Sequence, residues 1–291
     1  MTSSLHLPVI NINSVLEEDA VGPLLPTGKR HVSYSELVCW LECSFRHYLK
    51  YIKKVDLDGP SVHTEFGHVL HDMNEKFLKT RVMPSAVEAR KELTELYTKF
   101  NLNGSENEFH DTIAPITEEI PQFMDQTFKD WEFIGSEEKL YENSGVHEDQ
   151  FFKGFIDGIV KVPKSSRLKR AKPGEFEYWI IDLKTTSWGW DFKKKTDKNK
   201  ILQLALYKHF WSKKLGIDLK DIRCGFLLAK RTPAKGKPRC ELVAVSVGEK
   251  TIENALDNLG RMIGSVKKNL RSKNRNSCLY CVYKQTEHCP S

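Results

Sequence analysis

The spacing of apolar and polar residues changes near the middle of this 291-residue chain. Before residue 135, apolar positions recur every three or four residues, as they do on the buried face of a helix. Ser33 and Glu36 can form a capping box at the start of the first such stretch. The pattern predicts four helices in this part of the chain, over 33–52, 64–80, 84–100 and 115–133.

Strand patterns appear only after this helical part. Apolar residues alternate in 150–162, where glycines interrupt the run, and again in 175–185, which predicts a hairpin with a long basic connection. A buried helix, two more strands and a long amphipathic helix are expected after it, at 200–215, 222–230, 240–247 and 248–272. This order of elements predicts a mixed α/β core.

Length and composition fit one large globular domain, because 40% of the residues are hydrophobic and 29% are charged. Residues 1–32 contain three prolines and no sustained period, which indicates an N-terminal arm. We expect residues 33–291 to form a single domain, divided into a helical layer, an α/β core and a C-terminal helix with a cysteine-rich segment, at 33–135, 136–250 and 251–291.

The chain has no features of a membrane or secreted protein. No stretch approaches the roughly 20 apolar residues of a membrane span. The start, MTSSLHLPVININ, lacks the charged and apolar regions of a secretion signal. We therefore expect a cytoplasmic protein with no membrane partner.

Positive charge is concentrated in the second half of the chain. The net charge is only +6, but Lys and Arg crowd four runs in 161–174, 191–200, 228–239 and 265–277. Lysine-rich loops are often simply solvated, yet several such runs around one acidic centre indicate a polyanionic partner.

The stretch YWIIDLKTT carries candidate chemistry at the end of a predicted strand. Side chains alternate along a strand, so Asp182 and Lys184 point to the same face. A surface ion pair would explain these two residues alone. Asp157 lies among apolar residues of the preceding strand, where it either caps a turn at Gly158 or needs a cation. Two converging carboxylates are typical of a site for a hard divalent ion.

In order along the chain, Gly67 and His71, GFIDG with Asp157, IIDLK with Asp182 and Lys184, and QLALY with Gln203 and Tyr207 match a known pattern. This series resembles the PD-(D/E)xK nuclease superfamily, specifically its RecB-like branch. The resemblance implies a restriction-endonuclease-like core, with a mixed central sheet flanked by helices.

The resemblance also implies roles for these residues. His71, Asp157, Asp182 and the backbone carbonyl of Leu183 would bind Mg²⁺ or Mn²⁺, and Lys184 would orient or help deprotonate the attacking water. Gln203 and Tyr207 share a helix face and would position the lysine and the DNA strand. His63 and His68 compete with His71, and no motif singles out Glu65, Glu75 or Glu142, which could also contribute.

A second candidate metal site lies at the C-terminus, where CLYCVYKQTEHC places Cys278, Cys281 and Cys289 close together. RecB-like nucleases with an iron-sulfur cluster, such as AddB and the CRISPR adaptation nucleases, take a fourth cysteine from an N-terminal motif. The resemblance implies Cys43 for a 4Fe-4S cluster, with Cys39 as a weaker candidate. Ser44 replaces the family's proline, and the last spacing is seven rather than five. A structural Zn²⁺ site, involving His288, and free thiols are the alternatives.

We therefore predict a Mg²⁺- or Mn²⁺-dependent deoxyribonuclease, an exonuclease acting on single strands or duplex ends. Repair, recombination, CRISPR adaptation and viral DNA metabolism are the expected settings, with a helicase, recombination or CRISPR protein as a partner. A non-catalytic DNA-binding or assembly module and a structure-specific endonuclease are the alternatives. The expected DNA contacts are Lys164, Arg167, Lys169, Arg170, Lys193, Lys194 and Lys195.

Overall fold

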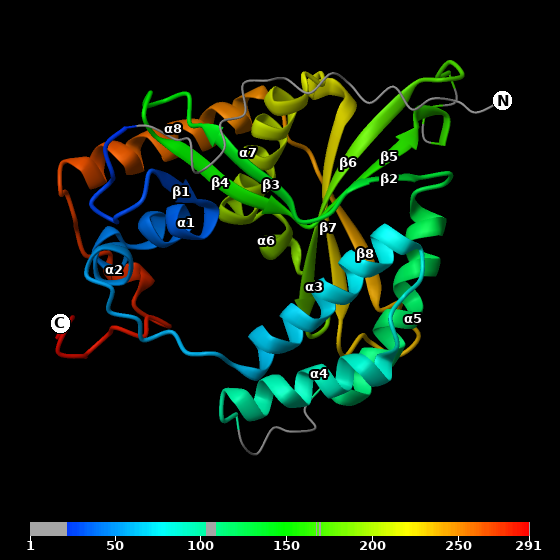
Figure 1. The fold of residues 1–291 in the computed structure, drawn as a ribbon, viewed down its shortest axis with the longest axis horizontal. Coiled ribbons are helices and arrows are strands. Elements are labelled where there is room, and N and C mark those ends of the chain that lie inside the picture. Colours follow the sequence, from blue (N-terminus) through cyan, green and yellow to red (C-terminus); the bar gives the residue numbers. More distant parts are fainter. Residues whose placement is uncertain (1–21, 103–108, 167, 169, 291) are drawn as a thin grey trace.

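The structure, a computed structural model, describes residues 22–102, 109–166, 168 and 170–290. The predicted DNA contacts Arg167 and Lys169, and residues 1–21 of the predicted arm, lie outside the described residues. Two sheets and the helices around them form the described part of the chain (Figure 1).

The larger sheet has five strands in the order β2-β5-β6-β7-β8. Strands β6 and β7 are parallel, and the other neighbours are antiparallel. The parallel pair is joined by a helical crossover through α7, as parallel pairing requires. The bounds are β2 Glu132–Gly135, β5 Gly158–Pro163, β6 Phe176–Thr186, β7 Ile222–Lys230, β8 Cys240–Val245, α6 Phe192–Lys195 and α7 Lys198–Leu215.

The smaller sheet has three strands in the order β1-β4-β3. Strand β1 (His31–Ser33) runs parallel to β4 (Phe151–Ile156), and β3 (Glu138–Asn143) pairs antiparallel with β4. The end of the predicted arm is therefore attached to the core through β1.

Helices cover both faces of the larger sheet (Figure 1). On one face, Phe66 and Leu70 pack with Leu183 of β6 in a core built by α3, α4 and α5. On the other face, Phe210 and Leu259 pack with Phe226 of β7 in a core built by α1, α7 and α8. The bounds are α1 Tyr34–Glu42, α3 Val62–Thr80, α4 Ala86–Lys99, α5 His110–Thr127 and α8 Glu249–Lys267. The predicted mixed α/β core flanked by helices is confirmed.

Three predicted elements differ in the structure. The first helix is interrupted at Cys43, whose extended backbone (φ −162°, ψ 109°) separates α1 from α2 (Ser44–His47) and the π-helical turn Tyr48–Ile52. The run 150–162, expected to form strands with a bulge or a turn, forms two strands that belong to different sheets. The helix predicted over 115–133 ends at Thr127, and β2 and β3, which were not predicted, follow it.

The remaining elements are short turns of 3-10 helix at Lys164–Ser166, Leu219–Asp221 and Arg275–Ser277. Among the described residues, no helix is both long and apolar enough to span a bilayer.

Candidate active site

Asp157 is the single residue between β4 and β5, at the point where the chain leaves the smaller sheet for the larger one. Gly158 pairs with Ile181 in the antiparallel register of β5 and β6, so Asp157 lies opposite Asp182. The backbone N–H of Leu183 donates a hydrogen bond to Asp157 Oδ2 at 2.8 Å. The sheet register thus brings together two carboxylates that are 25 positions apart in the sequence.

Asp182 is fully buried, and Lys184 Nζ lies 2.5 Å from its Oδ2. The two side chains are adjacent because positions two apart share a strand face. Burial acts to lower the pKa of Lys184, but Asp182 and Asp157 raise it, so the lysine stays charged. Within the described part of the chain, Asp182 Oδ1 has no hydrogen-bond partner. A buried carboxylate oxygen in this state is suited to a cation.

His71 of α3 faces this pair of acids. Its Nδ1 lies 3.3 Å from Asp157 Oδ2, whereas His68 Nδ1 lies 3.3 Å from Glu65 Oε2 and His63 packs on the Phe109 ring. Burial and the nearby Lys184 lower the pKa of His71. The imidazole is therefore neutral near pH 7, which is the form that binds metal.

Burial raises the pKa of Asp157 well above its ordinary value, and Asp182 raises it further. Two carboxylates in a poorly solvated site resist simultaneous ionisation unless a cation compensates them. Lys184 lowers the pKa of Asp157 but does not cancel the effect of burial. A bound cation would therefore let both carboxylates ionise.

Glu137 is a further acidic residue at this site that the sequence did not single out. Ligand atoms of His71, Glu137 and Asp157 lie within 4.8 Å of one another. Glu137 occupies the turn between β2 and β3, with a positive φ of 48°. Burial, Glu75 and Asp72 raise its pKa. Because β2 and β3 were not predicted, the turn between them could not be placed.

Gln203 and Tyr207 approach the acids from α7, which covers the face of the larger sheet opposite to α3. Gln203 Nε2 donates to Tyr207 Oη at 3.2 Å, and burial raises the pKa of the tyrosine hydroxyl. A Cβ at Gly154 of β4 would lie 2.7 Å from Tyr207 Cε1, so only glycine lets the tyrosine ring come this close to the strand. Gln203 Oε1 has no hydrogen-bond partner among the described residues.

The two basic runs predicted to flank the acids are placed differently. Lys193, Lys194 and Lys195 form α6, shortly after the end of β6 that carries Lys184. Lys164 and Arg170 belong to the connection at the opposite ends of β5 and β6, where Pro163 pairs with Phe176. At about 3.3 Å per residue, six strand residues put this connection roughly 20 Å from Asp157.

The placement of the first basic run beside the acids was therefore wrong, because the hairpin directs its loop away from them. Lys164 is also engaged, since its Nζ lies 2.6 Å from Asp221 Oδ1. Lys195 Nζ lies 2.6 Å from Glu241 Oε1. Lys193 and Lys194 are exposed. Of the two predicted basic runs, theirs is the one that follows the end of β6 carrying Lys184.

The four predicted cysteine ligands line one cavity of about 460 Å³ between α2 and the C-terminal segment. Figure 1 shows this segment (red) next to α2 (blue). Lys273, Arg275, Lys284 and Arg46 also line the cavity. Cys39 and His288 are not among the lining residues, and burial raises the pKa of the Cys39 thiol to about 12.

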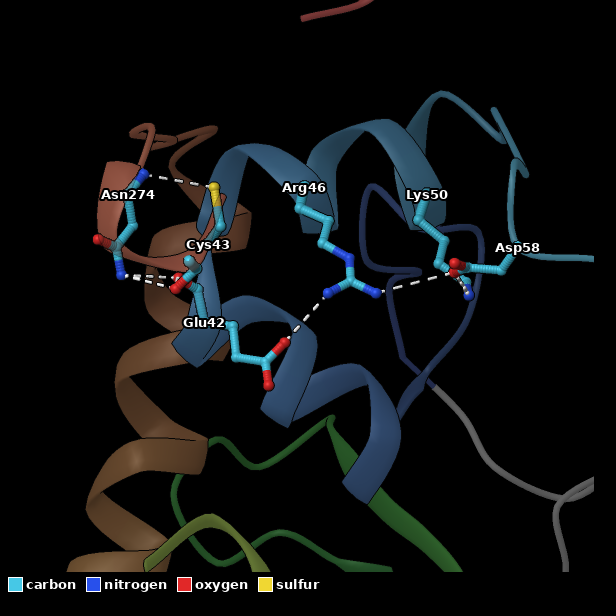
Figure 2. Close-up of polar contacts among 7 residues, drawn as sticks. Glu42, Cys43, Arg46, Lys50, Asp58 and Asn274 are labelled. Carbon is cyan, nitrogen blue, oxygen red and sulfur yellow. Dashed lines mark hydrogen bonds and ion pairs between the residues drawn. The ribbon is translucent and has the colours of Figure 1, made fainter. Parts of the chain in front are cut away.

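Hydrogen bonds join the interrupted first helix to the C-terminal segment (Figure 2). Asn274 donates through its backbone N–H to Cys43 Sγ at 3.4 Å and through Nδ2 to the Glu42 carbonyl at 2.8 Å. The backbone N–H of Ser272 donates to Ser44 Oγ at 2.8 Å. Ser44, where the resemblance expected proline, thus contributes to this junction.

Arg46 adds charged contacts along the same face (Figure 2). Its Nη1 lies 3.1 Å from Glu42 Oε2 and its Nη2 lies 3.9 Å from Asp58 Oδ2, and Asp58 also pairs with Lys50. These contacts hold a guanidinium at the edge of the cysteine cavity.

A mixed sheet that presents two converging acids and a lysine at its centre defines a restriction-endonuclease-like fold. The family model described as the PD-(D/E)XK nuclease superfamily matches residues 31–289. The chain belongs to this superfamily, and a nuclease is the activity that this membership supports.

A solved structure shares the fold. The crystal structure named "Putative exonuclease" from Eubacterium rectale is similar with a TM-score of 0.53 and 15% sequence identity, over 87% of this chain and 86% of that one. No curated protein matches the chain.

Proposed function

We propose that this protein is a Mg²⁺- or Mn²⁺-dependent deoxyribonuclease that degrades DNA from an end. One observation carries the proposal: Asp157 lies opposite a fully buried Asp182, with Lys184 Nζ at 2.5 Å and His71 Nδ1 at 3.3 Å from these acids. Membership of a nuclease superfamily supports a phosphodiester as the bond that this site hydrolyses.

The side chains present fit a hard divalent ion. Asp182 Oδ1 is a buried oxygen without a partner in the described chain, and His71, Glu137 and Asp157 place three more ligand atoms close together. Asp157, Asp182, His71 and the Leu183 carbonyl are the proposed ligands, with Glu137 as an additional one. A bound Mg²⁺ or Mn²⁺ would acidify water and neutralise charge on the scissile phosphate.

Lys184 is the proposed catalytic partner of these ligands. Its ammonium is kept charged by Asp182 and Asp157, so it can hold the attacking water in line and donate to a phosphate oxygen. Tyr207 packs closely on Gly154 of β4 and accepts a hydrogen bond from Gln203, and the two residues are proposed to position Lys184 and the DNA strand.

The activity test compares the wild-type protein with Asp182→Asn and Lys184→Ala on end-labelled linear DNA. With Mn²⁺, the wild type should release short products, and either variant should be slower by about a thousandfold or more, since each loses a group that stabilises the transition state. Full activity of Asp182→Asn would overturn the proposal.

A closed circular single strand separates the alternatives. An exonuclease leaves it intact, whereas a structure-specific endonuclease nicks a circle that carries a hairpin. A non-catalytic DNA-binding module would shift labelled DNA on a gel under every metal condition without consuming it.

We further propose that Cys43, Cys278, Cys281 and Cys289 hold a 4Fe-4S cluster. The four residues line one cavity with a basic lining, which would compensate the charge of an anionic thiolate cluster. Among the described residues, the metal-ligating side chains whose ligand atoms already lie within 4.8 Å of one another are His71, Glu137 and Asp157, so the four thiols would have to draw together on a bound cluster. Zn²⁺ on the same four thiolates is the alternative; His288 does not line the cavity. Protein purified without oxygen should contain about four iron and four sulfide per chain, and zinc without iron would decide for the alternative.

The biological setting remains a prediction. Repair, recombination, CRISPR adaptation and viral DNA metabolism each use end-directed nucleases, with a helicase or recombination protein as a partner. The cytoplasmic location and the division into arm, helical layer, α/β core and cysteine segment also stay predictions.

A further inference from the structure

A groove of about 970 Å³ begins where β6 ends, directly after Lys184. Its lining comes mostly from the stretch that links β6 to α7, together with His63 of α3 and Arg231 beyond β7. The groove therefore adjoins the end of β6 that carries Lys184.

Two large aromatic side chains of this stretch are exposed. Trp188 is 77% exposed and Phe192 is 82% exposed, whereas Trp190 between them is 8% exposed and packs against Phe226. Exposing an indole to water is unfavourable, because it forfeits the burial of a large apolar surface. The stretch thus uses one tryptophan for the core and presents the other aromatic residues outward.

The backbone around Trp188 is fixed rather than loose. The Ser187 carbonyl accepts hydrogen bonds from Thr232, through N–H at 2.7 Å and Oγ1 at 3.1 Å, and Arg231 Nη2 donates to Ser187 Oγ at 2.8 Å. Gly189 has a φ of +119°, which a residue with a side chain rarely adopts. The backbone at Trp188 is therefore already ordered by its neighbours Ser187, Gly189 and the buried Trp190. A ligand that binds the exposed ring would not have to order this backbone.

Positive charge lies in the same stretch as the two exposed aromatic residues, since Lys193 and Lys194 line the groove with Trp188 and follow Phe192 in α6. Lys193 and Lys194 are exposed, and no ion pair engages either side chain within the described ranges. The acids of the groove are already used: Asp191 Oδ1 accepts from the Lys194 N–H, and Asp197 Oδ2 lies 3.1 Å from Lys200 Nζ. The groove therefore offers the cations of Lys193 and Lys194 and the aromatic face of Trp188 to an anionic ligand, and Phe192 is exposed next to Lys193 in α6.

We propose that Trp188 and Phe192 stack on unpaired bases of a DNA strand while Lys193 and Lys194 bind its phosphates, so that the enzyme takes single-stranded DNA. Base faces are accessible to such rings only when the strand is unpaired, and stacking tolerates any sequence. This inference deepens the proposed function by naming the strand state that the same site accepts.

Binding to a fluorescein-labelled oligo(dT) 20-mer, measured by anisotropy in EDTA, tests the proposal without cleavage. Trp188→Ala and Phe192→Ala should each weaken binding about 10-fold, since stacking on one base is worth about this much. Trp188→Phe should largely restore it. Lys193→Ala should weaken binding and reduce its salt dependence. A blunt hairpin duplex should bind weakly to the wild type, and Trp188→Ala should not change this.

Tyr280→Ala is the matched control, because Tyr280 is 90% exposed but lies in the C-terminal segment. Its affinity for oligo(dT) should equal that of the wild type. Unchanged binding of oligo(dT) by the Trp188→Ala and Phe192→Ala double variant would overturn the inference. The two rings would then be candidates for contact with a protein partner. Since the assay needs no catalysis, loss of nuclease activity in Asp182→Asn is judged separately.

Discussion

The carboxylate site and the cysteine cavity are both assembled from segments far apart in the chain, but different forces hold them together. The acids are brought together by strand register between two buried strands. The cysteine cavity is closed by a coil segment that is attached to α1 and α2 through a few hydrogen bonds. The first site can therefore form without metal, whereas the second would gain most from a metal bound by its thiols.

This difference predicts that the two proposed metal sites have different roles. Ions at the acids relieve repulsion between groups that the sheet already holds in place, so they matter for chemistry more than for folding. A cluster at the cysteines would cross-link positions separated by 235 residues, so it matters for folding. The following variants test this contrast, from the largest expected effect to the smallest.

On the proposal that Cys43 is a ligand of a C-terminal cluster, Cys43→Ser should remove that cluster and destabilise the protein most. Loss of one of four ligands should abolish bound iron or zinc, and the melting temperature should fall on the order of 10 °C, because metal binding at such sites contributes to folding. Metal analysis and calorimetry measure the two effects. Asp182→Asn should leave the melting temperature of the metal-free protein within a few degrees of the wild type.

Cys39→Ser is the matched control for this experiment. Cys39 is in α1, is buried, and does not line the cavity. The variant should keep its metal, even if core packing suffers. Metal loss in Cys39→Ser with full retention in Cys43→Ser would exchange the roles of the two residues.

Gly154→Ala should disturb the carboxylate site indirectly, by displacing Tyr207. The new Cβ would lie 2.7 Å from Tyr207 Cε1, so the ring must move away from β4. Overpacking of this kind costs about 1–3 kcal/mol, and a displacement of order 1 Å can reduce the rate about a hundredfold. Urea unfolding and the nuclease assay measure these losses.

Gly59→Ala provides the comparison, because a Cβ at Gly59 would have open space around it. It should change neither quantity. Wild-type activity in Gly154→Ala would show that the position of the Tyr207 ring does not affect catalysis.

The repulsion between the acids should appear as a pH-dependent effect of Asp157→Asn on the metal-free protein. Burial and Asp182 raise the pKa of Asp157, so the folded protein keeps a proton that the unfolded chain releases above about pH 4. The stabilising contribution of protonated Asp157 is present below that pH and is lost as pH rises through the folded pKa. Asp157→Asn should therefore raise stability at pH 7 and have little effect near pH 4.

Denaturant unfolding in EDTA at a series of pH values measures this difference. Asp257→Asn, at an exposed position of α8, serves as the control and should show no such dependence. A constant difference between Asp157→Asn and wild type across the series would contradict the predicted repulsion.

Ser44→Ala should have the smallest effect. It removes the acceptor of the Ser272 N–H, a partly exposed hydrogen bond worth about 1 kcal/mol. The urea midpoint should decrease slightly, with metal content and activity unchanged. A loss as large as that of Cys43→Ser would mean that the hydrogen bonds, and not the cluster, hold the C-terminal segment in place.

Local pattern was sufficient for the elements that carry most of the site. The strand around Asp182, the helix with Gln203 and Tyr207, and the antiparallel pairing of β5 with β6 were all expected from spacing and confirmed. In these segments the hydrophobic period agrees with the environment, because each strand or helix is buried on the faces that its apolar residues occupy.

Local pattern was not sufficient where tertiary context decides. The glycines of 150–162 mark an interruption of the strand pattern at Gly158, but they do not show that β4 and β5 belong to different sheets. The helical period of 33–52 likewise hides the break at Cys43, whose extended backbone is stabilised by contacts with residues 272–274. Glu137 was missed because its turn joins two short strands that belong to different sheets.

The single-residue connection at Asp157 also limits how this chain can vary in length. Strands β4 and β5 are anchored in separate sheets on either side of it, so an insertion or deletion of one residue there would turn every following side chain of β5 to the opposite face. The connection between β5 and β6 carries no such constraint and can lengthen or shorten freely. Length variation is thus expected to be tolerated at the basic loop and excluded at Asp157.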